Sequence, residues 1–396
     1  MSLKQKKLQK KSEQLKEQKI KQIKNEIECC LIKFELPEEI ENIIIDYSFD
    51  ESTIETNKSL KKKVKDYYKT KKEYLISELD VSCVTSTHYL FTYFKNFNQR
   101  LDKWDTSNVE DMNRMFYNCQ KFDQPVNFDT SKVTDMSYMF YNCHKFNQPV
   151  NFDTSKVIYM SCMFHGCWIF NQPVNFNTLN VIDMTEMFLG CRTFNHPVNF
   201  NTSNVINMDH MFYDCNNFNQ QVNFDTSKVI NMKYMFSGCH KFNQQVNFNT
   251  SNVKYMNAVF DDCYEFNQPV NFNTINVTSM NSMFYNCKKF DQPVNFDTSK
   301  VTDMNAMFYN CYVFNQPVNF NTLNVKCMIY MFYNCYKFNQ SVNFDTINVI
   351  DMRNMFNGCY RFNQIVNFNT INVTDMSDMF ENCNSLQKEN KQLIMR

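Results

Sequence analysis

The residues most able to do chemistry are cysteines, and twelve of the seventeen recur every 24 residues. A thiolate can bind a metal, attack a substrate or pair in a disulfide. Zinc sites use close ligand pairs such as C-x-x-C, and the sequence has none. The six histidines are scattered over different positions of the repeat, and no glycine loop could bind phosphate. We therefore expect no enzyme activity, no metal site and no cofactor. The recurring cysteines, interpreted as small buried core residues, are Cys119, Cys143, Cys167, Cys191, Cys215, Cys239, Cys263, Cys287, Cys311, Cys335, Cys359 and Cys383.

Other cysteines lie outside this series. Cys162 and Cys327 stand at outward positions of the repeat, where we expect them to be open to oxidation or labelling. Cys29 and Cys30 form an isolated pair with no metal partner close by in the sequence. None of these cysteines indicates a catalytic arrangement.

The elements that position these residues repeat with the same period, which is typical of a solenoid. In each unit, five apolar residues are spaced for one face of a short helix, as in Val133, Met136, Met139, Phe140 and Cys143. Val150 and Phe152 then alternate with polar residues, which predicts a short strand with one buried face. One unit cannot bury enough apolar surface to fold alone, so the units must stack.

Glycine marks one position of the unit. All four glycines directly precede a ladder cysteine, and other units have Asn or Asp there; the four are Gly166, Gly190, Gly238 and Gly358. These residue types tolerate a left-handed backbone. We expect this position to end the helical turn.

The recurring signature V-T-x-M-x-x-M-F-x-x-C-x-x-F-N-Q-P-V resembles the repeats of the BspA-like leucine-rich-repeat surface protein family, over residues 80–385. Phe97–Cys119 is similar to the 25-residue form of that repeat, including Trp104. The resemblance implies an α/β, leucine-rich-repeat-like parallel solenoid, with one short strand and one short helical turn per 24-residue coil. It also implies adhesion or partner binding without catalytic residues.

Three domains are expected: a basic helical tail over residues 1–35, a small helical segment over 36–79, and a solenoid of about twelve repeats over 80–396 with degenerate terminal coils. The stretch "LPEEIENII" opens an amphipathic helix that is similar to an F-box over residues 36–47. That resemblance implies docking to a ubiquitin ligase through residues 36–79. The alternative is a helical cap that covers the open edge of the first coil.

Charge and hydropathy limit the partners and the location. The formal net charge is zero, so we expect no nucleic-acid partner. Lysine-rich stretches over residues 1–24 and 58–72 are interpreted as solvated helix faces. No apolar run is long enough to span a membrane, and the charged N-terminus carries no secretory signal. We therefore expect a cytoplasmic protein with reduced thiols.

Binding residues are expected where the units differ, because the residues that recur in every unit are those that the fold requires. Two of these positions, two before and one after the ladder cysteine, become tyrosine-rich in the later units. Clustered exposed aromatics favour partner contact, and the alternative is that they shield the helical edge. The candidate partner-binding residues are Tyr285, Tyr309, Tyr312, Tyr330, Tyr333, Tyr336 and Tyr360.

Two polar rows are also expected to face outward, an Asn row beginning at Asn127 and a Thr row beginning at Thr130. They could bind ice or a repetitive glycan, or hydrogen-bond along the stack, and we favour the second reading. The sequence as a whole predicts a non-catalytic protein–protein interaction scaffold, with an F-box-type substrate adaptor as its more specific form. The alternative is a structural or adhesive surface protein that binds a host ligand or glycan.

Overall fold

The structure is a computed structural model that describes residues 55–70 and 76–387. The chain divides into two compact units, Met1–Lys58 and Ser59–Arg396, and the second unit contains the repeats. The predicted basic tail, the F-box-like residues 36–47 and the pair Cys29–Cys30 lie outside the described residues. Within the described ranges, no helix is long and apolar enough to cross a membrane.

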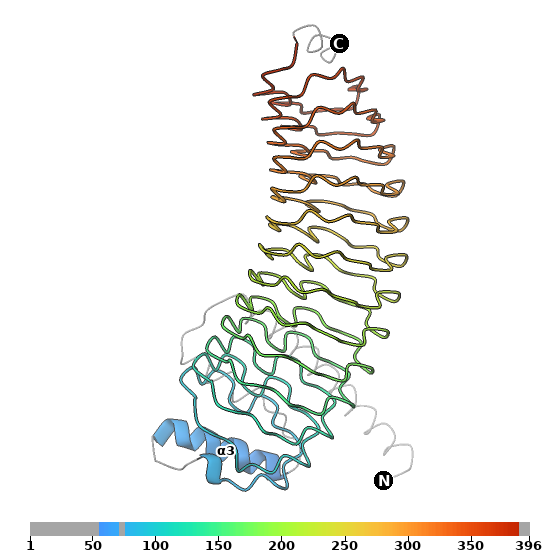
Figure 1. The fold of residues 1–396 in the computed structure, drawn as a ribbon. Coiled ribbons are helices and arrows are strands. Elements are labelled where there is room, and N and C mark those ends of the chain that lie inside the picture. The colour runs from blue at the N-terminus through green and yellow to red at the C-terminus, as the bar shows by residue number, and fades with distance from the viewer. Residues whose placement is uncertain (1–54, 71–75, 388–396) are drawn as a thin grey trace, which may run out of the picture. The chain divides into compact units, whose positions relative to one another are not determined.

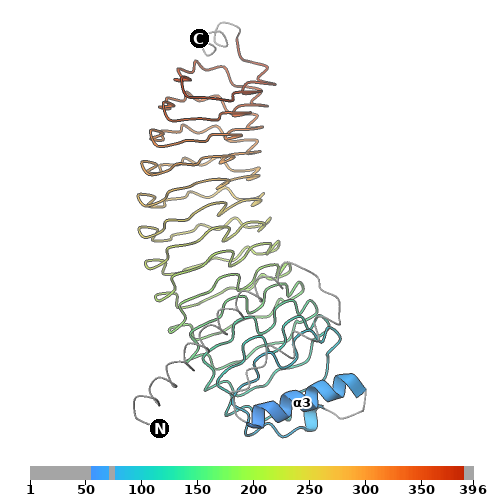
Figure 2. The same cartoon turned by 180° about the vertical axis from the view of Figure 1, so that it is seen from behind.

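In the described part of the chain, the only α-helix is α3, Glu55–Thr70, which is followed by the short 3-10 helix η1, Ile76–Glu78. Leu60 and Val64 are four residues apart, so they share one face of α3. Both are buried in the same apolar core as the coils. Lysines occupy much of the rest of the helix. The apolar face of α3 therefore packs at the N-terminal end of the stack, as Figures 1 and 2 show from two sides.

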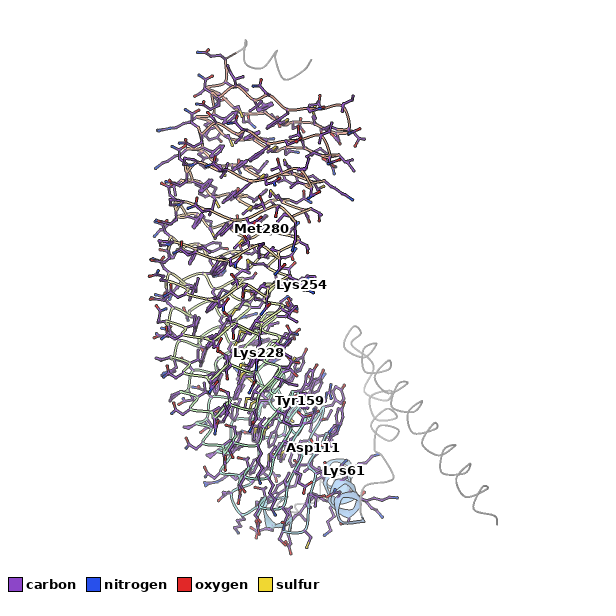
Figure 3. The ribbon with its side chains drawn as sticks, turned by 90° about the vertical axis from the view of Figure 1, so that its right-hand side faces the viewer. Lys61, Asp111, Tyr159, Lys228, Lys254 and Met280 are labelled. Carbon is purple, nitrogen blue, oxygen red and sulfur yellow. The ribbon has the colours of Figure 1, made fainter. Side chains whose placement is uncertain are left out.

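The repeats wind into a solenoid whose coils stack in chain order, which Figure 1 shows as a colour gradient. Parallel bridges join equivalent residues of successive coils, twelve bridges in residues 76–387. We call these residues the bridge row; two of them, Asp111 and Tyr159, are labelled in Figure 3. The predicted repeat solenoid is confirmed. The bridge row comprises Ser86, Asp111, Asp135, Tyr159, Asp183, Asn207, Asn231, Tyr255, Ser279, Asp303, Cys327, Asp351 and Asp375.

Backbone amides hold each coil to the next in a regular alternation. In residues 112–119, the amides of 112, 114, 116 and 118 donate to carbonyls of the following coil at 2.8–3.1 Å. The amides of 115, 117 and 119 instead donate to the carbonyl three residues earlier, closing successive β-turns within the coil. Three of these seven amides therefore hold the coil in shape, and four join it to the next coil.

The expected helical turn and strand are not present in this form. Between residues 79 and 387, the structure assigns no α-helix and no strand longer than a single bridge. Two residues of each coil have positive φ, such as Arg114 at 55° and Asn118 at 61°. A left-handed residue turns the chain before a helical hydrogen-bond series can continue, so consecutive turns replace the helix. Val150 and Phe152 are buried as predicted, but the backbone around them forms no ladder in the described repeats.

The core is built from columns of identical side chains. In one unit Val133, Met136, Met139, Phe140 and Cys143 are all fully buried, which confirms their predicted core position. The Phe140 ring lies 4.2 Å from the Phe146 ring of its own coil, and 5.5–5.6 Å from its equivalents in the two neighbouring coils. Such parallel rings fill the space between coils with well-defined contacts.

Candidate functional site

The ladder cysteines are part of the scaffold, as predicted, and the structure adds a reason for their identity. The thiol of Cys143 donates to the carbonyl of Phe116 at 3.1 Å, and the thiol of Cys167 donates to that of Phe140 at 3.1 Å. Every ladder cysteine makes the equivalent bond with the preceding coil. Burial raises the pKa of the Cys143 thiol well above its ordinary value, so no nucleophilic thiolate forms there.

The prediction that the threonine row faces outward is wrong. Thr130 and Thr154 are buried, and their hydroxyls donate to carbonyls of the next coil at 2.9 and 3.0 Å. An inward hydroxyl satisfies a carbonyl that no backbone amide reaches. The asparagine row that begins at Asn127 and Asn151 is exposed, as expected. Of these two rows, only the asparagine row therefore faces solvent, where a ligand could reach it.

Residue types differ between coils in several columns around the ladder cysteines, and three of these columns carry clustered tyrosines. We call the first positive-φ position of each coil the left-handed column; it contains Tyr89, Arg114, Tyr138, Cys162, Glu186, His210, Tyr234, Ala258, Ser282, Ala306, Tyr330, Asn354 and Asp378. The edge column lies two residues before each ladder cysteine, and the outer column lies one residue after it. Since the backbone repeats, equivalent side chains in these columns lie above one another.

The seven predicted tyrosines fall in these columns, and the structure brings them into two stacks. In the edge column, Tyr309 lies between Tyr285 and Tyr333, with ring centroids 4.4 and 4.7 Å apart. Tyr330 of the left-handed column meets Tyr309 and Tyr333 edge-on, at 5.9 and 5.4 Å. The outer column forms the second stack, with spacings of 4.7 and 4.8 Å, from Tyr312, Tyr336 and Tyr360. We call these seven residues the tyrosine face.

The tyrosine face is partly exposed and carries no charge on its rings. Tyr330 is 39% exposed and Tyr360 is 43% exposed, and the other five are half-buried. Partial burial raises the pKa of Tyr285 to about 12, and burial also raises the pKa of Tyr309 and Tyr336. Tyr285, Tyr309 and Tyr336 therefore stay neutral phenols near pH 7, and the rings of the face offer both apolar area and hydroxyl groups.

An acidic group borders the tyrosine face on its N-terminal side. Asp261 is the edge-column residue of the coil before Tyr285, and Ser237 donates to its Oδ2 at 3.1 Å. Its Oδ1 is buried without a hydrogen-bond partner in the described residues. Burial, followed by the negative charge of Asp262, raises the pKa of Asp261 to about 7.

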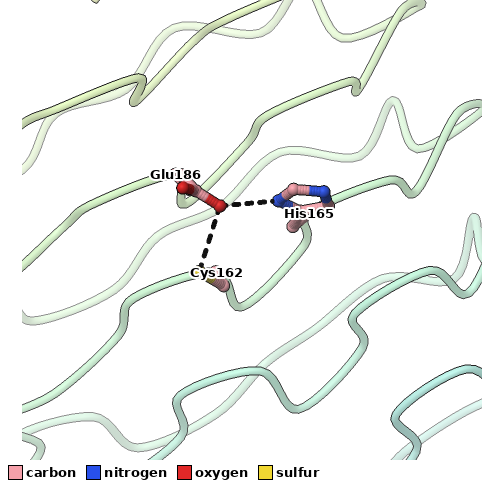
Figure 4. A group of neighbouring side chains, drawn as sticks. All are labelled: Cys162, His165 and Glu186. Carbon is pink, nitrogen blue, oxygen red and sulfur yellow. Dashed lines mark hydrogen bonds and ion pairs between the residues drawn. The ribbon is translucent and has the colours of Figure 1, made fainter. Parts of the chain in front are cut away.

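The prediction for Cys162 is wrong, and the structure reveals a cluster that the sequence interpretation missed. Cys162 is only 3% exposed, and its Sγ lies 3.5 Å from Oε2 of Glu186. The same carboxylate oxygen lies 2.9 Å from Nδ1 of His165, as Figure 4 shows. Burial raises the pKa of the Cys162 thiol, and also that of the half-buried Cys327. The missed signal is a C-x-x-H pair with a glutamate one full repeat after its cysteine.

Comparison with known proteins agrees with the repeat architecture. One family profile matches four successive stretches, residues 58–151, 150–223, 222–319 and 318–393. The match names neither the BspA-like family nor an F-box. No curated protein and no solved structure matches the chain. Because the four stretches together cover most of the sequence, the chain belongs to the family described as Mycoplasma protein of unknown function, DUF285.

Proposed function

We propose that this protein is a non-catalytic interaction scaffold that binds a protein partner through the tyrosine face. The observation that carries the proposal is the pair of tyrosine stacks, which lie at positions whose residue type differs between coils, whereas the core positions recur. Aromatic side chains dominate the energetics of many protein interfaces because they bury a large area with few rotatable bonds.

Preorganisation supports this assignment. Each ring of the tyrosine face is packed against a neighbour at 4.4–4.8 Å or held edge-on, so little side-chain freedom is left to lose on binding. Another tyrosine cluster lies in the early coils, where Tyr117 stacks on Tyr141 at 4.6 Å, but Tyr117 is buried there. The exposed tyrosines Tyr159 and Tyr255 of the bridge row are four coils apart. A partner that covers the tyrosine face meets two aromatic stacks, each of three coils, which together span four successive coils.

The non-catalytic part of the proposal rests on the state of the reactive side chains. The ladder thiols each donate to a carbonyl, and burial raises their pKa. A thiol that is both buried and hydrogen-bonded in this way is a poor nucleophile. Reduced thiols in such bonds also support the location inside the cell that we propose.

A more specific form of the proposal is an F-box-type adaptor, in which residues 36–79 dock to a ubiquitin ligase and the solenoid holds the substrate. The support is the resemblance of "LPEEIENII" to an F-box, together with the start of the family match at residue 58, after that stretch. The competing proposal is a structural or adhesive surface protein, and the exposed asparagine row is what favours it.

The test is quantitative affinity purification of the full chain and three variants from the cells that make it. Tyr309→Ser with Tyr333→Ser breaks the edge stack, and Tyr159→Ser with Tyr255→Ser is the control, since it removes tyrosines of 44% and 43% exposure from outside the face. We expect specific partners to fall at least about tenfold with the first pair only, as the loss of two interface aromatics implies.

The third variant, Leu36→Ala with Ile40→Ala, tests whether the F-box-like stretch docks to a ubiquitin ligase. Loss of ubiquitin-ligase subunits with this variant alone supports the F-box form, and their absence from every sample contradicts it. Equal partner recovery from the two tyrosine variants contradicts binding through the tyrosine face. Detection of the protein on the outside of intact cells supports the adhesive alternative.

A further inference from the structure

Three ligand-type side chains from two neighbouring coils converge beside the tyrosines of the early repeats. Cys162 and His165 are the ends of one turn, closed by the His165 amide, which donates to the Cys162 carbonyl at 3.2 Å. Glu186 occupies the same left-handed position in the next coil, one repeat later. The amide of Cys162 donates across the coils to the carbonyl of Thr185 at 2.8 Å, which fixes the two backbones relative to each other. The stack itself therefore positions the three side chains.

Their ligand atoms lie at distances that suit one metal ion. Oε2 of Glu186 is 2.9 Å from Nδ1 of His165 and 3.5 Å from Sγ of Cys162, and all three atoms lie within 4.8 Å of one another. A tetrahedral zinc ion with bonds of about 2.0 Å to N and O and about 2.3 Å to S separates its ligand atoms by roughly 3.3–3.6 Å. Small rotations of these side chains would reach that geometry.

The donor set also selects the kind of cation. Thiolate, imidazole and carboxylate together form a zinc-type set, whereas calcium and magnesium prefer oxygen ligands only. A thiolate and a carboxylate carry two negative charges, and a divalent cation would neutralise both in a partly buried place. We propose that Cys162, His165 and Glu186 bind one zinc-class divalent cation, with water in the fourth position.

Neighbouring side chains support the ligands. Tyr138, in the preceding coil, lies near Cys162, and the two side chains influence each other's pKa. The Tyr141 ring stacks on the His165 ring at 4.2 Å, which limits rotation of the imidazole. Such outer contacts orient metal ligands and raise affinity. The side chains of His165 and Glu186 remain 17% and 32% exposed, so a cation can enter from solvent on the Glu186 side.

The test is titration of the full, metal-free reduced chain with Zn²⁺ in the presence of a competing chelator, and with Co²⁺ under an absorption spectrometer. We expect one tight equivalent, with a thiolate-to-cobalt charge-transfer band and the visible bands of tetrahedral Co²⁺. Cys162→Ser and Glu186→Gln should each weaken Zn²⁺ binding by at least roughly 100-fold, above the range for outer contacts. Cys327→Ser is the control, because Cys327 is another cysteine outside the ladder, and it should change neither affinity nor spectrum.

The two ligand variants protect the test against a folding defect. Circular dichroism checks that both retain the solenoid, and Glu186→Gln carries the comparison if Cys162→Ser does not fold, because Gln keeps the size of the side chain and its hydrogen-bond acceptor. Retention of the tight equivalent and its charge-transfer band in either folded variant overturns the proposal. Failure of the full chain to bind Zn²⁺ also overturns it, and leaves the cluster as a hydrogen-bonded His–Glu pair beside a buried thiol.

Discussion

Replacement of Asp261 by Asn should stabilise the protein at neutral and alkaline pH and lose this effect in acid. The carboxyl is desolvated, Asp262 and Asp214 add negative charge nearby, and only Ser237 donates to it among the described side chains. Its folded pKa of about 7 exceeds the ordinary value of 3.8, so the folded protein holds this proton more tightly than the unfolded chain. Stability therefore falls as pH rises from about 4 to about 7, because the folded state must then bury the charge.

The size of the effect follows from the difference between the two pKa values. That difference is about three units, and at about 1.4 kcal/mol per unit the penalty above pH 7 is about 4 kcal/mol. Water reaches the half-buried side chain and screens part of the charge, so we expect to measure about 2 kcal/mol. Asn keeps the acceptor for Ser237 and cannot ionise, so Asp261→Asn should recover this amount.

The measurement is urea unfolding of the full chain and the variant at pH 4 and pH 8, followed by circular dichroism. Asp129→Asn is the control, because Asp129 is exposed and its pKa is lowered by its hydrogen bonds with Ser131. Relative to the unchanged protein, Asp129→Asn should lose a small amount of stability as pH rises, which is opposite in sign to the effect of Asp261→Asn. If Asp261→Asn shifts the unfolding free energy equally at pH 4 and pH 8, the idea that Asp261 is desolvated in the folded protein is refuted.

Three further predictions concern the repeat itself. Gly238→Ala should lower stability more than Gly190→Ala, because a Cβ at Gly238 would lie 2.3 Å from Asp214 Oδ1, whereas the atom nearest to a Cβ at Gly190 is 3.6 Å away. Thermal melts of the two variants compare the losses directly. Gly190→Asn should be tolerated to within about 1 kcal/mol, since Asn adopts the left-handed backbone that other coils use there, and a larger loss in the same melts would contradict the turn geometry. Cys239→Ala should cost about 1–3 kcal/mol of unfolding free energy and Cys239→Ser less, because Ser keeps a donor for the Phe212 carbonyl; equal losses would mean that the thiol bond contributes nothing.

Much of the fold could be predicted because the repeat shows which positions cannot change. The recurring Met, Phe and Cys positions are the core, and the position of Gly, Asn or Asp has positive φ, as its residue types indicate. The helix prediction failed at the first positive-φ position, the left-handed column, which holds residues such as Tyr138, Glu186 and Ala258. These residues carry no left-handed preference, so hydrogen bonds from the neighbouring coils impose the conformation there.

The candidate sites were predictable to different degrees for a similar reason. The tyrosine face could be found because most of its members recur 24 residues apart. Residues with that spacing occupy equivalent positions in neighbouring coils, where their side chains contact each other. The burial of Cys162 depends on what the adjacent coils place around it, namely Tyr138 and Glu186. A repeat pattern fixes the backbone position of a residue, but its exposure and partners depend on unlike side chains in other coils.

The alternation of backbone hydrogen bonds also affects how this molecule can evolve. Each coil bonds only to the coil before it and the coil after it, through atoms that every coil possesses. A duplicated 24-residue unit therefore finds its partners wherever it is inserted, and a deleted unit leaves its two neighbours able to join. Unequal recombination of the gene can therefore change the number of coils. Each exchanged unit replaces the surface side chains of one coil and leaves the backbone hydrogen bonds between coils intact.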